Sequence, residues 1–329
     1  MREEILVVGG AGYIGSHVAK ILSSRGYKPV ALDDLSSGHK QAARGFPLIQ
    51  GNYADISFVE KVLKEYRIGT VMHFGAKALV GESIENPLLY YATNVGGTVG
   101  LLTAMRNAGV RHFVFSSTCA TFGEPAQIPI HETVEQKPVN PYGQSKLFVE
   151  KILKDLERLG FRSAVLRYFN AAGADLHGEL GEDHRPETHL IPRAISVALG
   201  REKELVINGG DYATADGSCV RDYVHVNDLA EAHIKAMELI WEKDASFDFN
   251  LGTERGCSVF EVVQAIERAS GKKLPVRMGP RRPGDPPTLV ADSRKARDVL
   301  GWKPVIDLDT MVQTAYEWMK AHPNGYDSK

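Results

Sequence analysis

A glycine-rich loop near the start of the chain constrains the fold more than any other sequence feature. An apolar run over residues 5–8 leads directly into Gly9, Gly12 and Gly15, spaced three apart, and Gly10 completes a G-x-G-x-x-G pattern. Such a loop lets the backbone come close to a pyrophosphate and aims the anion at the positive end of the next helix. A glycine-rich turn can also serve tight packing alone, so the residues that follow are needed to distinguish dinucleotide binding from packing.

The segment after the loop favours dinucleotide binding. Apolar residues recur at helical spacing and stop at Gly26, and a short strand over residues 30–32 then ends in Asp33. A carboxylate about 20 residues beyond the glycines is placed to accept hydrogen bonds from ribose hydroxyls. Because it would repel a 2′-phosphate, the predicted cofactor is NAD rather than NADP.

Composition excludes several classes of protein. The formal net charge of −2 gives no sign of a nucleic-acid or membrane partner, and no apolar run reaches the roughly 18 residues of a membrane span. The first expected strand begins within five residues of Met1, which leaves no room for a signal peptide, so we expect a cytoplasmic protein. Cys119, Cys219 and Cys257 are far apart, and we expect reduced thiols with neither a disulfide framework nor a zinc site.

Strands and helices alternate along the first half of the chain. Strands separated by helices, with right-handed crossovers, predict an α/β fold built on a doubly wound, Rossmann-type parallel sheet. The further elements expected here are strands 70–74, 112–116 and 163–167 and helices 57–66, 86–107 and 141–159.

Local residues mark several helix ends. Ser57 and Glu60 form a capping-box pattern, and Asn86-Pro87 is typical of a helix start. Three glycines inside the long helix, Gly96, Gly97 and Gly100, indicate close approach of another element or of the cofactor, and the sequence favours packing as the reason.

Beyond residue 170 the pattern loosens into a polar stretch and shorter elements. Residues 227–241 and 247–251 are expected to return to the sheet as a helix and a strand. We therefore expect a smaller, discontinuous α/β lobe for the substrate: about 171–221 with 253–329, beside an NAD-binding domain of 1–170 with about 222–252.

The chemistry is expected in N-P-Y-G-Q-S-K, residues 140–146. Asn140 can cap a helix that Pro141 opens, which puts Tyr142 in the first turn and Lys146 one turn later on the same face. A helix N-terminus and a nearby ammonium both favour phenolate, so we expect a tyrosine pKa below its ordinary value of about 10 and a base usable near neutral pH. The plain alternative is a surface Tyr and Lys, but the dinucleotide loop and the hydroxyls of residues 116–118 favour catalysis.

Together these residues resemble the extended short-chain dehydrogenase/reductase superfamily, and within it the UDP-glucose 4-epimerases (UDP-galactose 4-epimerases). The likeness spans nearly the whole chain. The matching segments are G-G-A-G-Y-I-G-S-H (9–17), V-G-E-S (80–83), N-P-Y-G-Q-S-K (140–146), R-Y-F-N-A-A-G (167–173), D-G-S-C-V-R-D-Y-V-H-V (216–226) and R-R-P-G-D (281–285).

The resemblance implies a reaction without net redox change. Tyr142 would take the proton of the sugar 4-hydroxyl while NAD takes the hydride from carbon 4, and the 4-ketose would turn over and receive the hydride on its other face. Lys146 would hold the nicotinamide ribose, and Thr118 would hydrogen-bond the 4-oxygen. The resemblance also implies a homodimer formed through helices 86–107 and 141–159.

The same resemblance implies two sets of binding residues. The sequence itself indicates no metal site. Arginines suit a diphosphate because their fork binds two oxygens at once. The implied cofactor contacts are Gly9, Gly12, Tyr13, Ile14, Gly15, Asp33, Asp34, Ser37, Gly38, Asn52, Tyr53, Phe74, Ala76, Asn94, Lys146 and Phe169. The implied UDP-sugar contacts are Thr118, Tyr142, Asn170, His189, Leu190, Arg221, Arg282, Asp285 and Leu289.

Some residues depart from the family pattern and leave the sugar open. Thr118 stands where many members have Ser, Asn52 where an Asp is frequent, and His189 where an Asn often contacts the nucleotide. Leu289 aligns with a gatekeeper that is a large Tyr in members confined to simple hexoses and smaller in those that admit N-acetyl sugars. The S-S-T-C-A-T and G-E-D-H-R-P segments also resemble UDP-xylose (UDP-arabinose) 4-epimerases, so UDP-N-acetylhexosamines and UDP-pentoses remain alternative substrates.

Three alternative functions would require different residues in the sequence. A nucleotide-sugar 4,6-dehydratase needs an acid pair after Thr118, where Cys119-Ala120 stands. A non-catalytic NAD-binding regulator would tolerate loss of Tyr142 or Lys146, yet both are present. An NAD-dependent nucleotide-sugar dehydrogenase would exchange its cofactor at every turnover, which the sequence does not reveal.

Overall fold

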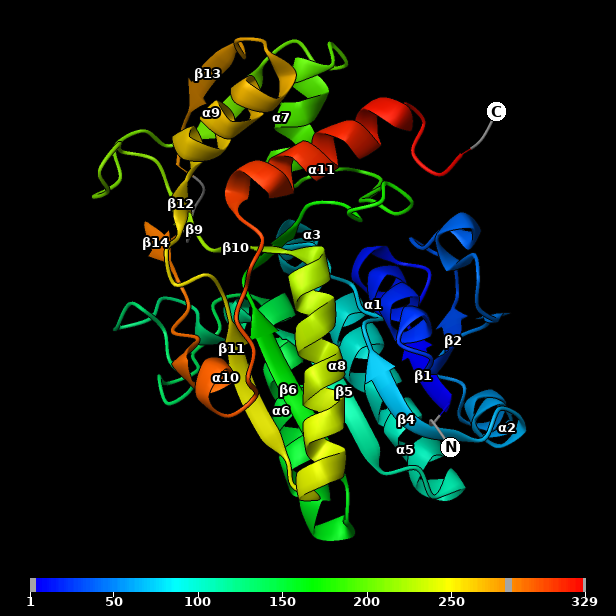
Figure 1. Cartoon of the computed structure of the whole chain (residues 1–329). Helices are drawn as coiled ribbons and strands as arrows, with labels where there is room; N and C mark the ends of the chain where they lie inside the picture. The colour runs from blue at the N-terminus through cyan, green and yellow to red at the C-terminus, as the bar shows by residue number, and fades with distance from the viewer. Residues whose placement is uncertain (1–3, 282–285, 328–329) are drawn as a thin grey trace.

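A seven-stranded parallel sheet forms the centre of the computed structural model, which describes residues 4–281 and 286–327 (Figure 1). The strand order is β11-β6-β5-β4-β1-β2-β3, so the chain winds outward from β1 in both directions and the predicted doubly wound fold is confirmed. The order reverses between β1 and β4, where sheets of this kind bind ligands at the carboxyl ends of the strands. The strands are β1 Glu4–Val8, β2 Lys28–Asp33, β3 Leu48–Gln50, β4 Ile68–His73, β5 His112–Thr118, β6 Arg162–Tyr168 and β11 Phe247–Leu251.

Helices cover both faces of this sheet. Ile5 and Val7 of β1 pack with α1 and α8, while Leu6 and Val8 pack with α2, α5 and α6, as the alternation of side chains along a strand requires. Figure 1 shows α8 lying across the near face. The helices around the sheet are α1 Tyr13–Ser24, α2 Ile56–Glu65, α3 Val80–Glu85, α4 Pro87–Tyr90, α5 Thr98–Ala108, α6 Pro141–Leu156, α8 Val226–Lys243 and α10 Arg294–Asp298. The short 3-10 segments are η1 Lys40–Ala43, η3 Cys119–Phe122 and η4 Glu157–Leu159.

The predicted start of α2 is wrong by two residues. Asp55, not Ser57, is the N-cap, and its side chain accepts a hydrogen bond of 3.0 Å from the Phe58 amide. A carboxylate at this position satisfies an amide that the helix itself leaves unpaired.

The single helix expected over residues 86–107 is instead α4, a wide π-type segment (η2 Tyr91–Gly97) and α5 in succession. Gly109 ends it in the left-handed conformation, and the side chain of Asn86 makes no capping hydrogen bond. A Cβ on Gly97 would meet the Tyr53 ring at 2.7 Å, and one on Gly100 would meet the Ala54 carbonyl oxygen at 2.8 Å. Close packing therefore explains these two glycines, whereas Gly96 faces no such contact.

The other part of the chain has its own apolar core. Ile191, Ile195, Val262, Ile266 and Val312 are buried between α7, α9 and α11. Ser258 and Glu261 form the expected capping box at the start of α9. These elements are α7 Leu190–Ala198, α9 Val259–Ser270 and α11 Leu308–Ala321, with the strands β7 Asn170–Ala172, β8 Leu205–Asn208, β9 Val220–Arg221, β10 Tyr223–His225, β12 Cys257–Ser258, β13 Val276–Gly279 and β14 Thr288–Leu289. The short strands pair as β7 with β10, β8 with β13, and β12-β9-β14.

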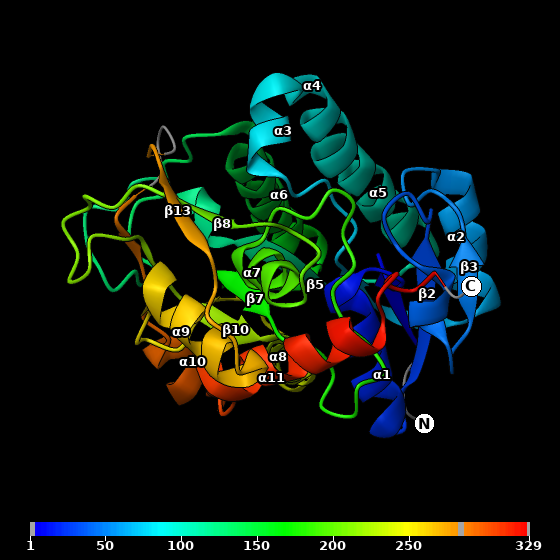
Figure 2. The same ribbon diagram turned by 90° about the horizontal axis from the view of Figure 1, so that it is seen from above.

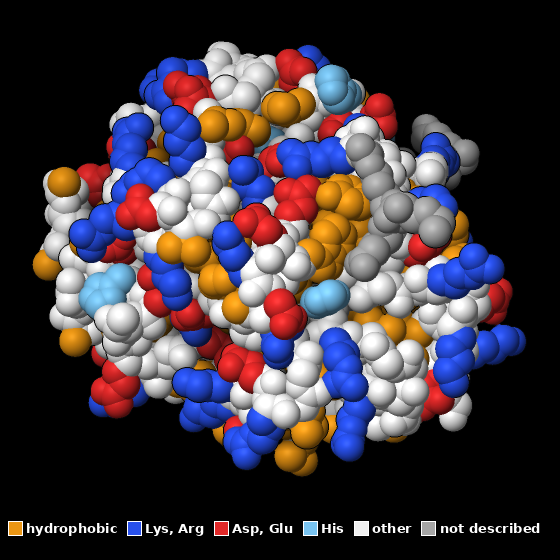
Figure 3. All heavy atoms as spheres, turned by 60° about the horizontal axis from the view of Figure 1, so that its bottom comes forward, with side chains coloured by type: hydrophobic (Ala, Val, Ile, Leu, Met, Phe, Trp, Pro, Cys, Tyr) orange, Lys and Arg blue, Asp and Glu red, His pale blue; other side chains and the backbone are white. Residues whose placement is uncertain are grey.

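The surface carries charges of both signs. Lys and Arg side chains are interspersed with Asp and Glu over the face in Figure 3. Over the described parts of the chain, no helix combines the length and apolar character that crossing a membrane requires.

Candidate active site

The carboxyl ends of the parallel strands bring the predicted cofactor residues to one edge of the sheet. Gly9 to Gly15 follow β1, Asp33 to Gly38 follow β2, Asn52 and Tyr53 follow β3, and Phe74 and Ala76 follow β4. Thr118 ends β5, and Phe169 and Asn170 follow β6. Strand–helix alternation therefore gathers residues more than 100 positions apart into a single line.

The glycines of the loop are required for different structural reasons. Gly9 has a φ of 76°, and a Cβ there would lie 2.6 Å from the Gly75 amide nitrogen. Cβ atoms on Gly10 and Gly15 would likewise collide with Ala31 and with the Gly9 carbonyl group. A Cβ on Gly12 would meet only the Gly9 oxygen, at 3.3 Å, and Gly12 caps α1 without any side-chain hydrogen bond. Gly12 thus leaves the positive end of α1 open for an anion.

Asp33 stands beside this loop. Its two carboxylate oxygens accept hydrogen bonds from the amides of Ala11 at 3.0 Å and Leu35 at 2.8 Å. Burial raises its pKa, and the two amides oppose that shift. Each oxygen keeps a further lone pair, so the carboxylate can still accept from a ribose hydroxyl.

Other predicted cofactor residues lie around the same edge. Asp34, Ser37 and Asn52 are exposed. The Tyr13 hydroxyl donates to the Gly173 carbonyl oxygen at 2.6 Å, which joins α1 to the segment after β7, and Ile14 follows it in the first turn of α1.

The remaining members of this set are engaged by protein groups. The Tyr53 hydroxyl donates to the Thr93 carbonyl at 2.9 Å, and the Phe74 ring packs on His233. Asn94 is buried, with its amide bonded to both backbone groups of Lys77 and to the Ser145 hydroxyl. Phe169 is buried among apolar side chains that include Phe122 and Ile130.

Tyr142 and Thr118 form the predicted catalytic pair. Asn140 accepts a hydrogen bond of 2.9 Å from the Gly143 amide and Pro141 opens α6, as expected, so Tyr142 lies in the first turn. Burial raises the pKa of Tyr142 to about 12, and a hydrogen bond with the Thr118 side chain counteracts part of that rise. The expectation of a lowered pKa is therefore wrong for the protein groups alone, because desolvation of the phenolate outweighs the favourable contact.

The Lys146 ammonium is held by other groups of the protein. Its Nζ donates to the Ser116 carbonyl oxygen at 2.8 Å and lies 4.9 Å from the centre of the Phe115 ring. Burial lowers its pKa to about 7, while the negative charge of Glu150 favours the protonated form.

A buried ion-pair network lies behind Lys146. Nη2 of Arg167 is 2.7 Å from Glu150 Oε2, Nε lies 3.1 Å from both carboxylate oxygens, and Nη1 is 2.9 Å from Asp248. Gln136 and Ser117 also donate to Glu150. Sequence reasoning missed Glu150, although it follows Lys146 by one helical turn.

Four predicted substrate residues line one pocket between the sheet edge and the smaller core. Its volume is about 210 Å³, and Asn170, His189, Leu190 and Arg221 all contribute to its wall. Arg193, which sequence reasoning did not single out, lines it too. Leu289 is not part of this wall, but it pairs with Arg221 between β14 and β9. Arg282 and Asp285 lie outside the described residues.

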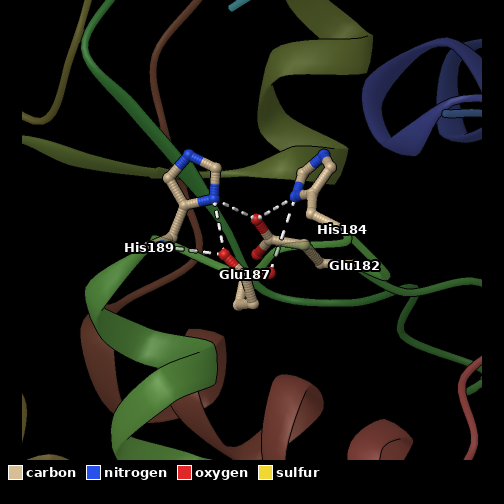
Figure 4. Close-up of side chains that lie close together, drawn as sticks. All are labelled: Glu182, His184, Glu187 and His189. Carbon is tan, nitrogen blue, oxygen red and sulfur yellow. Dashed lines mark hydrogen bonds and ion pairs between the residues drawn. The ribbon is translucent and has the colours of Figure 1, made fainter. Parts of the chain in front are cut away.

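A cluster of two histidines and two glutamates adjoins this pocket (Figure 4). His189 Nδ1 lies 2.7 Å from Glu182 and 3.0 Å from Glu187, and His184 Nδ1 lies 3.0 Å from Glu182. Burial opposes charge on both rings, but the carboxylates outweigh it and raise the pKa of His184 to about 9 and of His189 to about 10. The alternating acids and histidines of E-D-H-R-P-E-T-H are the sequence signal for this cluster. Sequence reasoning names only His189 of its four residues as a site residue.

Sequence and fold together define the class. Residues 5–252 match the NAD dependent epimerase/dehydratase family, and the chain belongs to it. A UDP-glucose 4-epimerase of Rhizobium leguminosarum bv. trifolii is 49% identical over 317 residues, which are 96% of this chain and 97% of the relative. The resemblance to UDP-glucose 4-epimerases is thereby confirmed.

Solved structures agree over the whole length. The UDP-glucose 4-epimerase of Brucella ovis in complex with NAD is 50% identical with a TM-score of 0.94, covering 96% of this chain and 98% of that one. The UDP-glucose 4-epimerase of Stenotrophomonas maltophila, with bound NAD and formylated UDP-arabinopyranose, is 38% identical with a TM-score of 0.95, covering 98% and 99%.

Proposed function

We propose that this protein is an NAD-dependent UDP-glucose 4-epimerase that interconverts UDP-glucose and UDP-galactose. The observation that carries the proposal is that the Tyr142–Thr118 pair lies at the same sheet edge as the glycine loop. Asn170, which follows β6 at this edge, lines the pocket together with His189, Leu190 and Arg221. The near full-length likeness to UDP-glucose 4-epimerases supports it.

The residues present suit NAD. Gly12 leaves the N-terminus of α1 open for a pyrophosphate, and the Asp33 carboxylate suits a ribose diol and disfavours a 2′-phosphate. When bound, NAD supplies a hydride acceptor for sugar carbon 4 and a positive charge that favours the phenolate form of Tyr142.

The protein's own residues manage the proton. Tyr142 Oη takes the proton of the sugar 4-hydroxyl as the hydride leaves, and returns it when the hydride comes back to the other face. Thr118 holds the 4-oxygen, while Lys146, fixed through Ser116, orients the nicotinamide ribose. Arg221 and the other cationic groups of the pocket bind the diphosphate, with Arg282 as a further proposed contact. Asp285 is a further proposed contact of the nucleotide sugar.

The lobe boundaries follow from this assignment. We assign NAD binding to residues 1–170 with about 222–252, and nucleotide-sugar binding to about 171–221 with 253–329. The proposed location is the cytoplasm, where NAD and UDP-sugars are both available.

We also propose a homodimer built on α3, α4, α5 and α6. Ile84 is 63% exposed and Leu88 80% exposed, and Leu89, Val99 and Phe148 are exposed apolar residues of the same group of helices. Figure 2 shows α3, α4 and α5 together at one side of the molecule. Burying such a face in a second copy would remove apolar surface from water.

The test is to incubate purified protein, without added NAD, with UDP-glucose, UDP-galactose, their N-acetyl counterparts and UDP-xylose, and to separate the products. Interconversion of the two hexoses is the expected result, and the panel also reports the N-acetylhexosamine and pentose alternatives. Accumulation of NADH only after NAD is supplied would instead identify a nucleotide-sugar dehydrogenase and overturn the proposal.

A further inference from the structure

The segment between β7 and α7 brings four possible metal ligands together. Glu182, His184, Glu187 and His189 each offer one atom, and these atoms all lie within 4.8 Å of one another. Figure 4 shows both imidazole rings turned toward the two carboxylates. Among the described residues, this group is the one whose side chains could hold a metal ion.

The spacing of these atoms is close to that of a tetrahedral site. The two Nδ1 atoms lie 3.0 and 2.7 Å from Glu182 Oε1, and 3.6 and 3.0 Å from the two different carboxylate oxygens of Glu187. Metal–ligand bonds of about 2.0–2.1 Å imply edges of about 3.3 Å. All four ligand atoms lie within 4.8 Å of one another, so modest side-chain rotations would bring them to such spacings around a metal ion.

The donor set indicates which kind of ion fits. Two imidazole nitrogens with two carboxylate oxygens suit a borderline divalent ion such as Zn²⁺ or Co²⁺, whereas Mg²⁺ and Ca²⁺ prefer oxygen ligands alone. All four ligands come from eight consecutive residues, so little chain has to be ordered to close the chelate. The carboxylates form the inner side of the cluster, with the Glu182 side chain 9% and the Glu187 side chain 21% exposed, while the His189 side chain is 46% exposed and leaves the site open to an ion from solution.

We propose that Glu182, His184, Glu187 and His189 form a four-coordinate site for a divalent transition metal ion at the wall of the nucleotide-sugar pocket. Without a metal, the same side chains hold one another as ion pairs, so the fold of the segment does not depend on it. The proposal is independent of the reaction proposed above, because none of its evidence comes from the catalytic pair.

The test uses untagged full-length protein treated with a chelator and then titrated with Co²⁺. Tetrahedral Co²⁺ absorbs visible light far more strongly than octahedral Co²⁺, so the spectrum reports both binding and geometry. We expect one equivalent to bind with an intense visible band, which Zn²⁺ then displaces. His184→Gln and Glu187→Gln should each weaken binding at least tenfold, whereas His177→Gln, which removes an exposed histidine of the preceding segment, should leave it unchanged.

Two outcomes would overturn the proposal. Absence of saturable binding, or only a weak octahedral spectrum in the unmodified protein, would mean that the cluster is an ion-pair clamp and nothing more. A tetrahedral band that survives both substitutions would place the metal elsewhere, for example at a cysteine. The Co²⁺ titration of the unmodified protein tests the proposal even if one of the variants folds poorly.

Discussion

Tyr142 takes up and gives back one proton in each turnover of the proposed mechanism, so the energetics of its hydroxyl matter most at the scale of residues. Burial works against the phenolate, and the Thr118 hydrogen bond works in its favour. Removing the Tyr142 hydroxyl should therefore change kcat, whereas removing only its hydrogen-bond partner on Thr118 should change the pH at which Tyr142 acts.

Tyr142→Phe should lower kcat by about 10²–10⁴-fold, since a positioned acid–base group contributes that much to the rate. NAD content should not change, because the glycine loop and Asp33 lie on other strands. Steady-state kinetics together with the absorbance of cofactor released on denaturation would check both parts. A variant retaining a tenth or more of the activity would exclude Tyr142 as the base.

Thr118→Val should move the pH profile of kcat. Without its hydrogen bond the pKa of Tyr142 rises further, so the base is deprotonated only at higher pH and the ascending limb shifts upward by about one pH unit. Thr118→Ser keeps the hydroxyl and is the matched control. Equal profiles for the Val and Ser variants would show that this hydrogen bond does not tune the base.

The sequence could predict the positions of Tyr142 and Lys146 on α6 but not the charges and hydrogen bonds around them. The i, i+4 spacing of Tyr142 and Lys146 and the cap at Asn140 follow from helix geometry, and the structure has both. Spacing cannot show that Lys146 Nζ turns to the Ser116 carbonyl, nor that Glu150 is held by Arg167 from another strand. Those contacts depend on how β5, β6 and α6 pack.

At the scale of elements, the packing of α5 against the loop before α2 is set by a single missing Cβ. Gly100→Ala would place a methyl group 2.8 Å from the Ala54 carbonyl oxygen, which is backbone and cannot move aside cheaply. The expected loss is about 1–3 kcal/mol in the free energy of unfolding, which exceeds the roughly 1 kcal/mol of helix propensity that alanine gains.

Gly96→Ala is the matched control, because its nearest contact would be the Tyr91 oxygen at 3.8 Å. Urea unfolding of both variants would check the pair. If Gly100→Ala proved as stable as Gly96→Ala, the packing explanation for Gly100 would fail.

Regular strands and helices were predictable because their apolar residues repeat with period two or near 3.6. The start of α2 and the π-type segment were not, since they depend on which side chain finds which amide and on local packing, whereas the start of α4 at Pro87 was predicted correctly. The three-residue strand β3 is too short to show a period, and it forms because β2 offers it an edge.

At the scale of the whole molecule, the proposed dimer face carries exposed apolar residues on α3, α4, α5 and α6. Leu88→Asp would put a charge at its most exposed apolar position, where burial in a second copy would desolvate the carboxylate. We expect the variant to be monomeric in analytical ultracentrifugation at micromolar concentration, with the parent protein dimeric. Val305→Asp is the control, because Val305 is also exposed, at 73%, but lies outside these helices. Loss of the dimer in both variants, or in neither, would argue against this face.

Contacts that depend on the path of a loop, such as Glu182 with His189, and the pocket that joins Asn170 to Arg221 mark the limit of prediction from sequence. The likeness to known epimerases suggested which residues bind the sugar. The ion pairs among residues 182–189 follow from the path of the loop, which no periodicity encodes.

Four buried histidines make the fold sensitive to acid. Burial lowers the pKa of His17, His225 and His233 to about 4 and that of His73 to about 3, all below the ordinary value of 6.5. Between these values and pH 6.5 the unfolded chain binds more protons than the folded one, so stability rises with pH in this window and is lost on acidification. Each group can contribute up to about 1.4 kcal/mol per pH unit.

His233 is the clearest place to test this account. Its Nδ1 donates to the Leu229 carbonyl oxygen at 2.7 Å, and its Nε2 is buried without a hydrogen-bond partner among the described residues, so a second proton would be unsolvated. His233→Leu should flatten the slope of unfolding free energy against pH between 4.5 and 6.5 by up to about 1.4 kcal/mol per unit. Exposed His177→Gln should leave that slope unchanged in urea titrations at constant ionic strength. An unaltered slope in His233→Leu would mean that the protonated ring is accommodated inside the fold, and that the acid sensitivity arises from other groups.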